Sequence, residues 1–199
     1  MGEIIAAIDI ETTGLDPHYH DIIELAIQPL TDTFEINPVI APLVARIKAR
    51  RPQNASSRAL EVNGLDMNDG DEYDEVLARI KSWLAEYGIE KINILGQNVD
   101  FDRTFIEAQI PELGRLFGHR DIRDSQRLAR AVNDLAILRG EKPPFEKLGL
   151  VDLRAALGIE GSQPHRALDD ARDAARVFKA LLERMNIDLK KRKNSNVYV

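Results

Sequence analysis

Cysteine is absent from the 199-residue chain, which excludes disulfide bonds and thiolate metal sites. A chain without disulfides suits the reducing cytoplasm, where we expect the protein to act. Long apolar runs are absent too. None approaches the roughly 18 residues of a membrane-spanning helix, and the N-terminus lacks the basic-then-apolar pattern of a secretion signal. We therefore expect no membrane partner.

A net positive charge is absent: 33 acidic residues outnumber 27 basic ones, so the formal net charge is −6. This balance argues against a protein that coats duplex DNA through charge alone. Residues 36–60 differ in charge from the rest of the chain. They contain no acid and five basic residues: Arg46, Lys48, Arg50, Arg51 and Arg58. Two interpretations stay open for this stretch, a solvated loop and a lip that contacts phosphates. The basic run at 190–193 is expected to belong to a frayed end.

No feature of the sequence divides the chain into separate units. It shows no internal repeat, no low-complexity tract and no linker rich in Gly, Ser or Pro. A composition of 44% hydrophobic and 30% charged residues is typical of a globular protein. We predict a single domain over residues 1–187, followed by a basic and polar tail over residues 188–199.

The order of elements predicts an α/β protein. Residues 3–10 are apolar on both faces, as in a central strand, and residues 21–30 form a second strand. Residues 34–43 are a weaker edge-strand candidate that prolines interrupt. The remainder predicts, in order, a helix over 73–87 ended by Gly88, a strand at 91–96, a helix from near Asp100, a short strand at 120–124, a helix around 128–135, a loop at 141–150 and a helix over 164–184. This order favours one mixed sheet with helices packed on it.

Two acids stand at the end of the first predicted strand. In "AAIDIETTG", Asp9 and Glu11 are two residues apart, so their side chains point to the same face. Neighbouring buried carboxylates repel one another, and a divalent cation would relieve that repulsion. A simpler interpretation is that both acids are solvated or that one caps a turn. A calcium-binding loop is disfavoured because His20 stands where its twelfth position requires Glu.

The last predicted helix supplies a further acid. Its apolar stripe consists of Ala171, Ala174, Ala175, Phe178 and Leu182. On the helical wheel Asp169 and Asp173 lie nearly opposite this stripe and are predicted to face solvent, whereas Asp170 turns toward the core. His165 can share a site with Asp170 only from the loop or first turn before the helix. A capping or surface histidine is the simpler interpretation of His165.

The stretch "ILGQNVDFDRTFI" (94–106) runs from a buried strand through a polar turn into a helix. It contains Asn98, Asp100 and Asp102. Asp100 could be the helix N-cap and Asp102 an ordinary acid of the first turn, which the helix dipole favours. The pattern alone does not choose between the two aspartates.

Taken in order, "DIETTG" at 9–14, "NVDFD" at 98–102 and "HRALDDA" at 165–171 resemble the three signature segments of the DEDDh 3′→5′ exonucleases. This is the proofreading-exonuclease family within the ribonuclease H-like fold. The resemblance implies a mixed five-stranded sheet, its first three strands antiparallel, flanked by helices. Asn63 and Gln97 stand where many relatives carry His, which weakens any assignment to a closer subfamily.

The resemblance also implies roles for single residues. Asp9, Glu11, Asp102 (rather than Asp100) and Asp170 would hold two Mg²⁺ or Mn²⁺ ions, hard cations that prefer oxygen ligands. His165 would be the base that accepts a proton from the attacking water, a task suited to a group that titrates near neutral pH. Substrate-binding candidates are Thr12, Thr13, Leu15, Asn98 and Phe105. For Phe105 a packing role is the competing interpretation.

The implied activity is 3′→5′ hydrolysis of single-stranded DNA to nucleoside 5′-monophosphates. Three alternatives stay open: a ribonuclease that trims short RNA or RNA 3′ ends, an inactive nucleic-acid-binding module, and a metal-stabilised structural domain. Aromatic residues make up only 6% of the chain, so few side chains can stack on bases. We therefore expect modest affinity and little sequence preference. A DNA polymerase is a partner that the resemblance allows, and the oligomeric state is left open.

Overall fold

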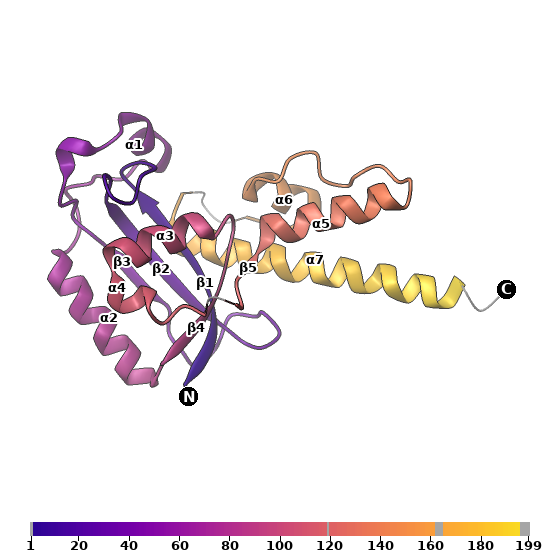
Figure 1. The fold of residues 1–199 in the computed structure, drawn as a ribbon, viewed down its shortest axis with the longest axis horizontal. Coiled ribbons are helices and arrows are strands. Elements are labelled where there is room, and N and C mark those ends of the chain that lie inside the picture. The colour runs from indigo at the N-terminus through magenta and orange to yellow at the C-terminus, as the bar shows by residue number, and fades with distance from the viewer. Residues whose placement is uncertain (1, 119, 162–164, 196–199) are drawn as a thin grey trace.

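A five-stranded mixed sheet forms the centre of the molecule, a computed structural model that describes residues 2–118, 120–161 and 165–195, with side chains up to residue 186. The strand order is β3-β2-β1-β4-β5 (Figure 1). The strands are β1 (Glu3–Thr12), β2 (Ile22–Leu30), β3 (Leu43–Arg46), β4 (Lys91–Gly96) and β5 (Arg123–Asp124). The pairs β1–β2 and β2–β3 are antiparallel, whereas β1–β4 and β4–β5 are parallel. The predicted fold class is confirmed.

Helices cover both faces of this sheet. They are α1 (Ser57–Asn63), α2 (Tyr73–Tyr87), α3 (Asp100–Gln109), α4 (Pro111–Gly114), α5 (Ser125–Leu138), α6 (Leu150–Leu157) and α7 (Ala167–Ser195), with a 3-10 turn at Pro52–Asn54. The spacing of Val76, Ile80 and Trp83 places one stripe of α2 in the core, and Gly88 ends the helix in the left-handed conformation (φ 58°).

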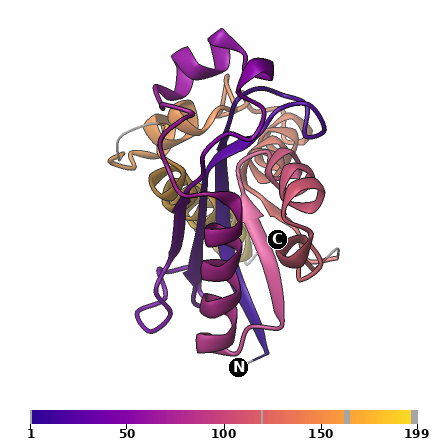
Figure 2. The same cartoon turned by 90° about the vertical axis from the view of Figure 1, so that its left-hand side faces the viewer.

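The two faces of β1 carry different cores. Ile8 and Ile10 pack with α2 and α3, whereas Ala7 packs with the alanines of α7. The apolar stripe predicted for the last helix is thus the surface that lies on the sheet. Figure 2 looks along α7 from its N-terminal side and shows α2 in front of the sheet.

Beyond the sheet, α7 continues alongside α5 and α6, and these helices form an arm that projects from the body (Figure 1). Its core contains Ala129, Val132, Leu153, Val177 and Leu181. None of the helices within the described ranges is long and apolar enough to cross a membrane.

Several predicted boundaries were wrong. The third strand is not at 34–43 but at Leu43–Arg46. Prolines interrupt the earlier stretch, which contributes only a single bridge from Ile36 to Leu30. Helices α1 and α6 were not predicted, and α7 continues past the expected end at residue 184. Its expected start at Pro164 lies outside the described residues. β1 runs unbroken through Asp9 and Glu11, which rules out the calcium-loop interpretation.

Asp173 was also predicted wrongly. It is fully buried rather than facing solvent. Its carboxylate pairs with Arg154 of α6 and with Arg176 one turn along α7 (3.1 Å). The wheel failed because it considered only the sheet, whereas α6 covers the other side of α7.

Candidate active site

The end of β1 presents two acids on the face that α7 covers. Ala7 packs against α7, and alternate residues of a strand share a face, so Asp9 and Glu11 follow it on that side. Both side chains are half-buried. Strand periodicity alone therefore predicts to which face of the sheet both carboxylates point.

Helix α3 brings a third acid to the same place. β4 pairs with β1 only as far as Ala7, and beyond it the backbone N–H of Ile10 donates to Oδ1 of Asp102 (3.0 Å). Asp102 is 4% exposed. Asp100 instead forms ion pairs with Arg103 (3.3 Å) and Arg127, away from this cluster. Of the two aspartates that the pattern left open, Asp102 is the one beside β1.

The start of α7 brings a fourth acid and a histidine. His165 precedes the helix in the left-handed conformation (φ 61°), and its backbone N–H donates to Oδ2 of Asp170 (3.0 Å). A ring nitrogen of His165 and carboxylate oxygens of Glu11 and Asp170 all lie within 4.8 Å of one another. His165 is exposed, so its ring is free to meet a ligand that enters from solvent. His165 thus meets the condition that the sequence set for sharing a site with Asp170, because it lies ahead of α7, which begins at Ala167.

The four carboxylates lie within one another's electric field. Burial, followed by the charges of Asp102, Asp170 and Glu11, raises the pKa of Asp9 well above its ordinary value. Burial and then the Asp170 charge raise the pKa of Glu11 to about 7. Burial raises the pKa of Asp102 and of Asp170 as well, and the backbone hydrogen bonds that each accepts oppose this. Such a cluster stabilises a bound cation strongly.

A fifth acid, Glu24, was not predicted. It pairs with Glu11 across the β1–β2 ladder and is 6% exposed. One of its oxygens accepts the backbone N–H of Ala167 (2.8 Å), so it holds the first turn of α7 against the sheet. Glu24 also contributes to the raised pKa of Asp9 and Glu11. Glu24 reaches the site only through its cross-strand position opposite Glu11, and the sequence alone does not show that register.

A cavity of about 410 Å³ opens beside Glu11. Its lining is mainly apolar and comes from β1, the loop after β1, the segment around α1, and α3: Ile10, Glu11, Thr12, Gly14, Leu15, His20, Ser56, Arg58, Ala59, Val62, Asn63 and Phe101. Two of the predicted substrate-binding residues, Thr12 and Leu15, belong to this wall, and Leu15 is 82% exposed. The sequence analysis had named Arg58 and Asn63 of the α1 segment, but it did not place His20, Ala59 or Val62 in this wall, since only the fold brings them here.

Three predicted substrate-binding residues do not line the cavity. Phe105 is fully buried among apolar side chains, so it cannot stack on a base and that prediction was wrong. Its neighbour Phe101 lines the cavity instead. Thr13 is also buried, and its hydroxyl accepts the backbone N–H of Asp21 (2.9 Å). Asn98 is exposed in the left-handed conformation (φ 55°) at the turn before α3.

Comparison with known families decides the assignment. The family model described as RNase_T exonuclease matches residues 6–178, which include all three predicted signature segments. The chain belongs to this exonuclease family. Its resemblance to the DEDDh 3′→5′ exonucleases is thereby confirmed.

Individual relatives agree with the family. A DNA polymerase III of PolC type from Thermotoga petrophila is 30% identical over 181 residues, which cover 89% of this chain and 12% of the polymerase. The chain thus spans about a ninth of the length of the curated relatives it matches. E. coli exonuclease I in complex with a dT13 oligonucleotide has a TM-score of 0.70 at 22% identity, over 95% of this chain and 43% of that one. The nuclease domain of 3′hExo, a DEDDh family member bound to rAMP, has a TM-score of 0.63 at 19% identity, over 90% and 92%.

The exonuclease cluster suits divalent metal ions. Its donors are carboxylate oxygens, which hard cations such as Mg²⁺ and Mn²⁺ prefer. Glu11 and Asp170 hold oxygens close enough to share one ion. Burial is the main cause of the raised pKa of all four acids, and repulsion within the cluster adds to it for three of them, Asp9, Glu11 and Asp102; a bound cation would favour the ionised form of each acid. The residues present therefore fit the metal-dependent chemistry of the family.

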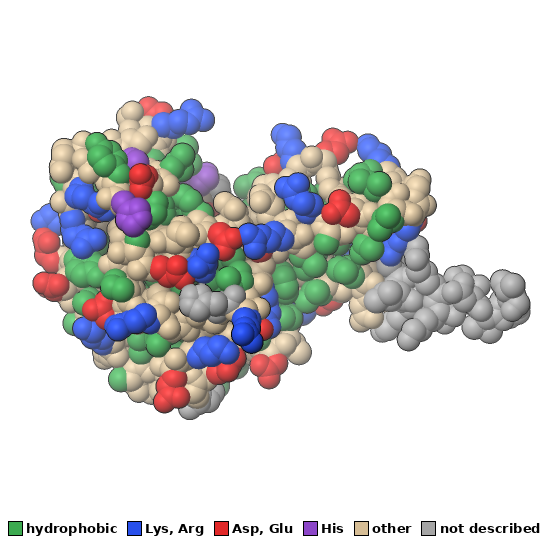
Figure 3. Space-filling model, viewed as in Figure 1, with side chains coloured by type: hydrophobic (Ala, Val, Ile, Leu, Met, Phe, Trp, Pro, Cys, Tyr) green, Lys and Arg blue, Asp and Glu red, His purple; other side chains and the backbone are tan. Residues whose placement is uncertain are grey.

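The basic stretch of residues 36–60 mostly serves the fold. Arg46 lies 3.9 Å from Glu24, Lys48 pairs with Glu72 (2.7 Å), and Arg51 pairs with Asp21 (2.8 Å). Arg58 alone of the five basic residues lines the cavity. On the face shown in Figure 3, basic and acidic side chains alternate and form no continuous positive stripe.

Proposed function

We propose that this exonuclease domain removes nucleotides from the 3′ end of single-stranded DNA and releases nucleoside 5′-monophosphates. The observation that carries the proposal is the convergence of Asp9, Glu11, Asp102 and Asp170 beside a nucleotide-sized cavity. A terminal nucleotide in that cavity would place its phosphodiester next to the acids. Small-molecule pockets in proteins start at about 300 Å³, so the cavity is large enough for one nucleotide.

In this proposal the four acids hold two Mg²⁺ or Mn²⁺ ions. Bound there, the ions would activate the attacking water and stabilise the charge that develops on the phosphate. The hydrogen bond from the Ile10 N–H to Oδ1 of Asp102 orients this carboxylate and leaves acceptor sites for a cation or for its bound water. The charges of both Asp102 and Asp170 act on Asp9, which supports a role for Asp9 toward both ions.

His165 has the role of general base. Its ring is exposed and lies within reach of Glu11 and Asp170, at the mouth of the cluster. From this position it can accept the proton of the attacking water and pass it to solvent. The hydrogen bond from its backbone to Asp170 ties its loop to the acid cluster.

The wall of the cavity would bind the last nucleotide. Leu15 and Val62 are exposed apolar side chains of the lining, from the loop after β1 and from α1. The ring face of a base gains from contact with such surfaces, whereas the exposed guanidinium of Arg58 suits a phosphate. Thr12 and Asn98 stay substrate-binding candidates.

DNA is favoured over RNA by the relatives. The curated relatives named above are DNA polymerases of PolC type, and E. coli exonuclease I, a structural neighbour, was solved with a DNA oligonucleotide. They also support a DNA polymerase as the partner class. RNA 3′ ends are the second candidate, supported by the 3′hExo nuclease domain bound to rAMP, which matches this chain over most of both lengths. Matched DNA and RNA oligonucleotides of several lengths, compared by kcat/KM, would separate the two.

The decisive test uses a 5′-labelled single strand with Mg²⁺ and, in parallel, with EDTA. We expect a ladder of 3′-shortened products with Mg²⁺ and no products with EDTA. Asp9→Asn and Asp170→Asn should abolish the ladder, while the matched control Asp169→Asn, adjacent on the same helix, should keep it. Cleavage that persists in EDTA, or an Asp170→Asn variant as active as Asp169→Asn, would overturn the proposal.

A further inference from the structure

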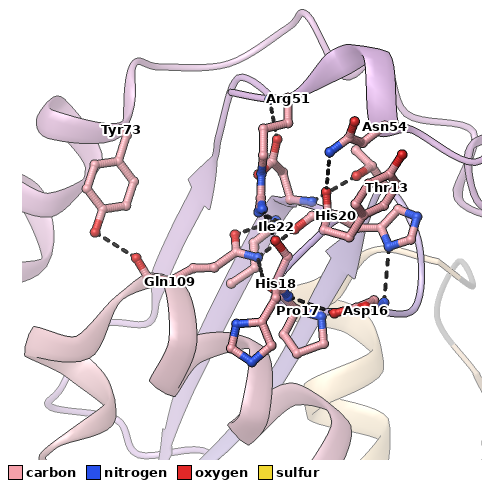
Figure 4. A network of polar contacts seen from close by, with 12 residues as sticks. Thr13, Asp16, Pro17, His18, His20, Ile22, Arg51, Asn54, Tyr73 and Gln109 are labelled. Atoms are coloured by element: carbon pink, nitrogen blue, oxygen red, sulfur yellow. Dashed lines mark hydrogen bonds and ion pairs between the residues drawn. The ribbon is translucent and has the colours of Figure 1, made fainter.

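The loop that connects β1 to β2, residues 13–21, is fixed from outside by polar side chains (Figure 4). This loop supplies Gly14, Leu15 and His20 to the wall of the cavity. Its shape therefore decides where those side chains stand. The residues that fix it lie outside the cavity and belong to neither the metal cluster nor the lining.

Two side chains, Gln109 and Arg51, hold the loop by hydrogen bonds to its backbone, and we call them the braces. Gln109, in the last turn of α3, is the first. Its side chain is buried, and Nε2 donates to the carbonyl oxygens of Pro17 (2.8 Å) and His20 (2.6 Å). Oε1 accepts the backbone N–H of Ile22 (3.2 Å). Tyr73 of α2 in turn donates to the Gln109 carbonyl (2.7 Å), which anchors the end of α3. The amide thus joins the loop to the helix that carries Asp102.

Arg51, which precedes the 3-10 turn at Pro52–Asn54, forms the second brace. Its guanidinium donates to the carbonyl oxygens of His18 and His20 (2.6 Å for His20) and to Oδ1 of the buried Asp21 (2.9 Å). Its backbone N–H donates to the other oxygen of Asp21 (2.6 Å). The His20 carbonyl therefore receives hydrogen bonds from both braces. Asn54 adds a bond to the Tyr19 carbonyl (2.8 Å).

Inside the loop, His20 is held against Gly14. A Cβ atom at Gly14 would lie 2.1 Å from Cδ2 of His20, so the imidazole packs directly on the glycine backbone. Nδ1 of His20 accepts the backbone N–H of Asp16 (3.1 Å). The ring position therefore follows from the loop backbone, and the backbone follows from Gln109 and Arg51.

We propose that Gln109 and Arg51 are positioning residues for the 3′-terminal nucleotide. By holding the carbonyls of the β1–β2 loop, they keep Leu15 and His20 in the conformation that closes the cavity wall. The inference rests on the proposed function, because it assigns the cavity to the terminal nucleotide. Loss of either brace loosens substrate binding while the acids, which β1, α3 and α7 carry, keep their places.

The test compares three variants with a matched control. Gln109→Glu keeps an acceptor for Ile22 but loses the Nε2 donor, Gln109→Leu loses both, and Arg51→Met loses the guanidinium. The control is Asn133→Leu. Asn133 braces a remote loop in the same manner, with its amide bonded to the backbone N–H (3.0 Å) and carbonyl (2.7 Å) of Phe145. For each protein we would measure the melting temperature, kcat and KM on a single-stranded oligonucleotide, and the Kd of a nucleoside 5′-monophosphate.

We expect Gln109→Glu and Arg51→Met to raise KM at least tenfold while kcat stays within threefold of the wild-type value. Asn133→Leu should lower the melting temperature comparably and leave KM within twofold. If Gln109→Leu does not fold, Arg51→Met and Asn54→Ala, which change half-buried side chains, test whether the braces affect KM. Unchanged KM in folded brace variants, or an equal rise in Asn133→Leu, would overturn the inference.

Failure of the proposed function can be distinguished from failure of the inference about Gln109 and Arg51. A wild-type protein that cleaves no oligonucleotide would refute the function, whatever the variants do. The mononucleotide Kd then tests the braces alone: a weaker Kd in Gln109→Glu and Arg51→Met supports them, and an unchanged Kd, or no binding by any of the proteins, overturns them.

Discussion

At the scale of single residues, the acids at the end of β1 are held at a cost that a cation would remove. Glu11 illustrates this best because its pKa is about 7 in the folded protein against an ordinary value of 4.5. The folded state therefore binds this proton more tightly than the unfolded chain does. Stability must then fall as pH rises through the interval between the two values.

We predict that the metal-free protein loses about 1–3 kcal/mol of unfolding free energy between pH 4.5 and 7, an estimate reduced for the partial exposure of Glu11. Glu11→Gln should flatten this slope, although Asp9 and Asp102 will keep part of it because their pKa values are raised too. Urea denaturation in EDTA at several pH values measures the effect. A stability that rises over the same interval would contradict it.

His165 gives a second prediction at this scale. His165→Ala should lower kcat by about 10²–10⁴, the usual contribution of a positioned general base. Because the side chain is exposed, the unfolding free energy should change by no more than about 0.5 kcal/mol. The Mg²⁺-induced rise in melting temperature separates a base from a metal ligand. It should persist in His165→Ala, and its loss would make the histidine a ligand.

The sequence could predict the position of a residue when that position depends only on the residue's own strand or helix. Asp9 and Glu11 followed from strand alternation, and Asp170 from the helical wheel, because each needs only the period of its own element. Phe105 and Asp173 were misplaced because their surroundings come from other elements, the α2–α3 core and α6. Asp102 was chosen over Asp100 by family resemblance, since its partner Ile10 is 92 residues away in the chain.

At the scale of elements, α6 and α7 are joined through the buried pair Arg154–Asp173. The Arg154 side chain is only 12% exposed and Asp173 is fully buried. Asp173→Asn should destabilise the protein by about 3–5 kcal/mol, because it leaves a buried guanidinium without its charge partner. Thermal or urea unfolding measures this loss. The double variant Arg154→Met with Asp173→Leu should recover much of the stability, and a double variant no better than Asp173→Asn would argue against the charge-pair explanation.

Apolar patterning predicted most strands and the longer helices but missed two short helices. β1, β2, β4, α2, α5 and α7 carry an apolar run or stripe, and even the two-residue β5 lies within the predicted strand at 120–124. α1 and α6, at seven and eight residues, bury one residue each, Asn63 and Leu153, so they carry too little pattern to be recognised. Their stability comes from contacts with the rest of the fold, which no local signal reports.

At the scale of the whole molecule, metal binding and folding must be coupled, because the acid cluster forms only when three distant segments meet. Mg²⁺ or Mn²⁺ should therefore raise the melting temperature, with a gain of about 2.7 kcal/mol when the ion is present at 100 times its Kd. Asp9→Asn should abolish most of this gain, whereas Asp169→Asn should retain it. Differential scanning calorimetry over a metal titration measures the shift. A melting temperature that does not change with metal concentration would contradict the proposed ligand set.

The position of β1 between β2 and β4 has a consequence for engineering. Residues Ile5–Ala7 of β1 pair with strands on both sides, and Asp9 and Glu11 follow directly on this segment while still paired with β2, so two of the four acids rest on a part of the sheet that resists shifting. The cavity wall, by contrast, comes largely from the β1–β2 connection and the segment around α1, both at the periphery. The acids that would carry out the reaction and most of the cavity wall that would bind the substrate therefore lie on different parts of the fold. Grafting a different peripheral segment onto this scaffold should retune which polynucleotide is accepted without rebuilding the reaction centre.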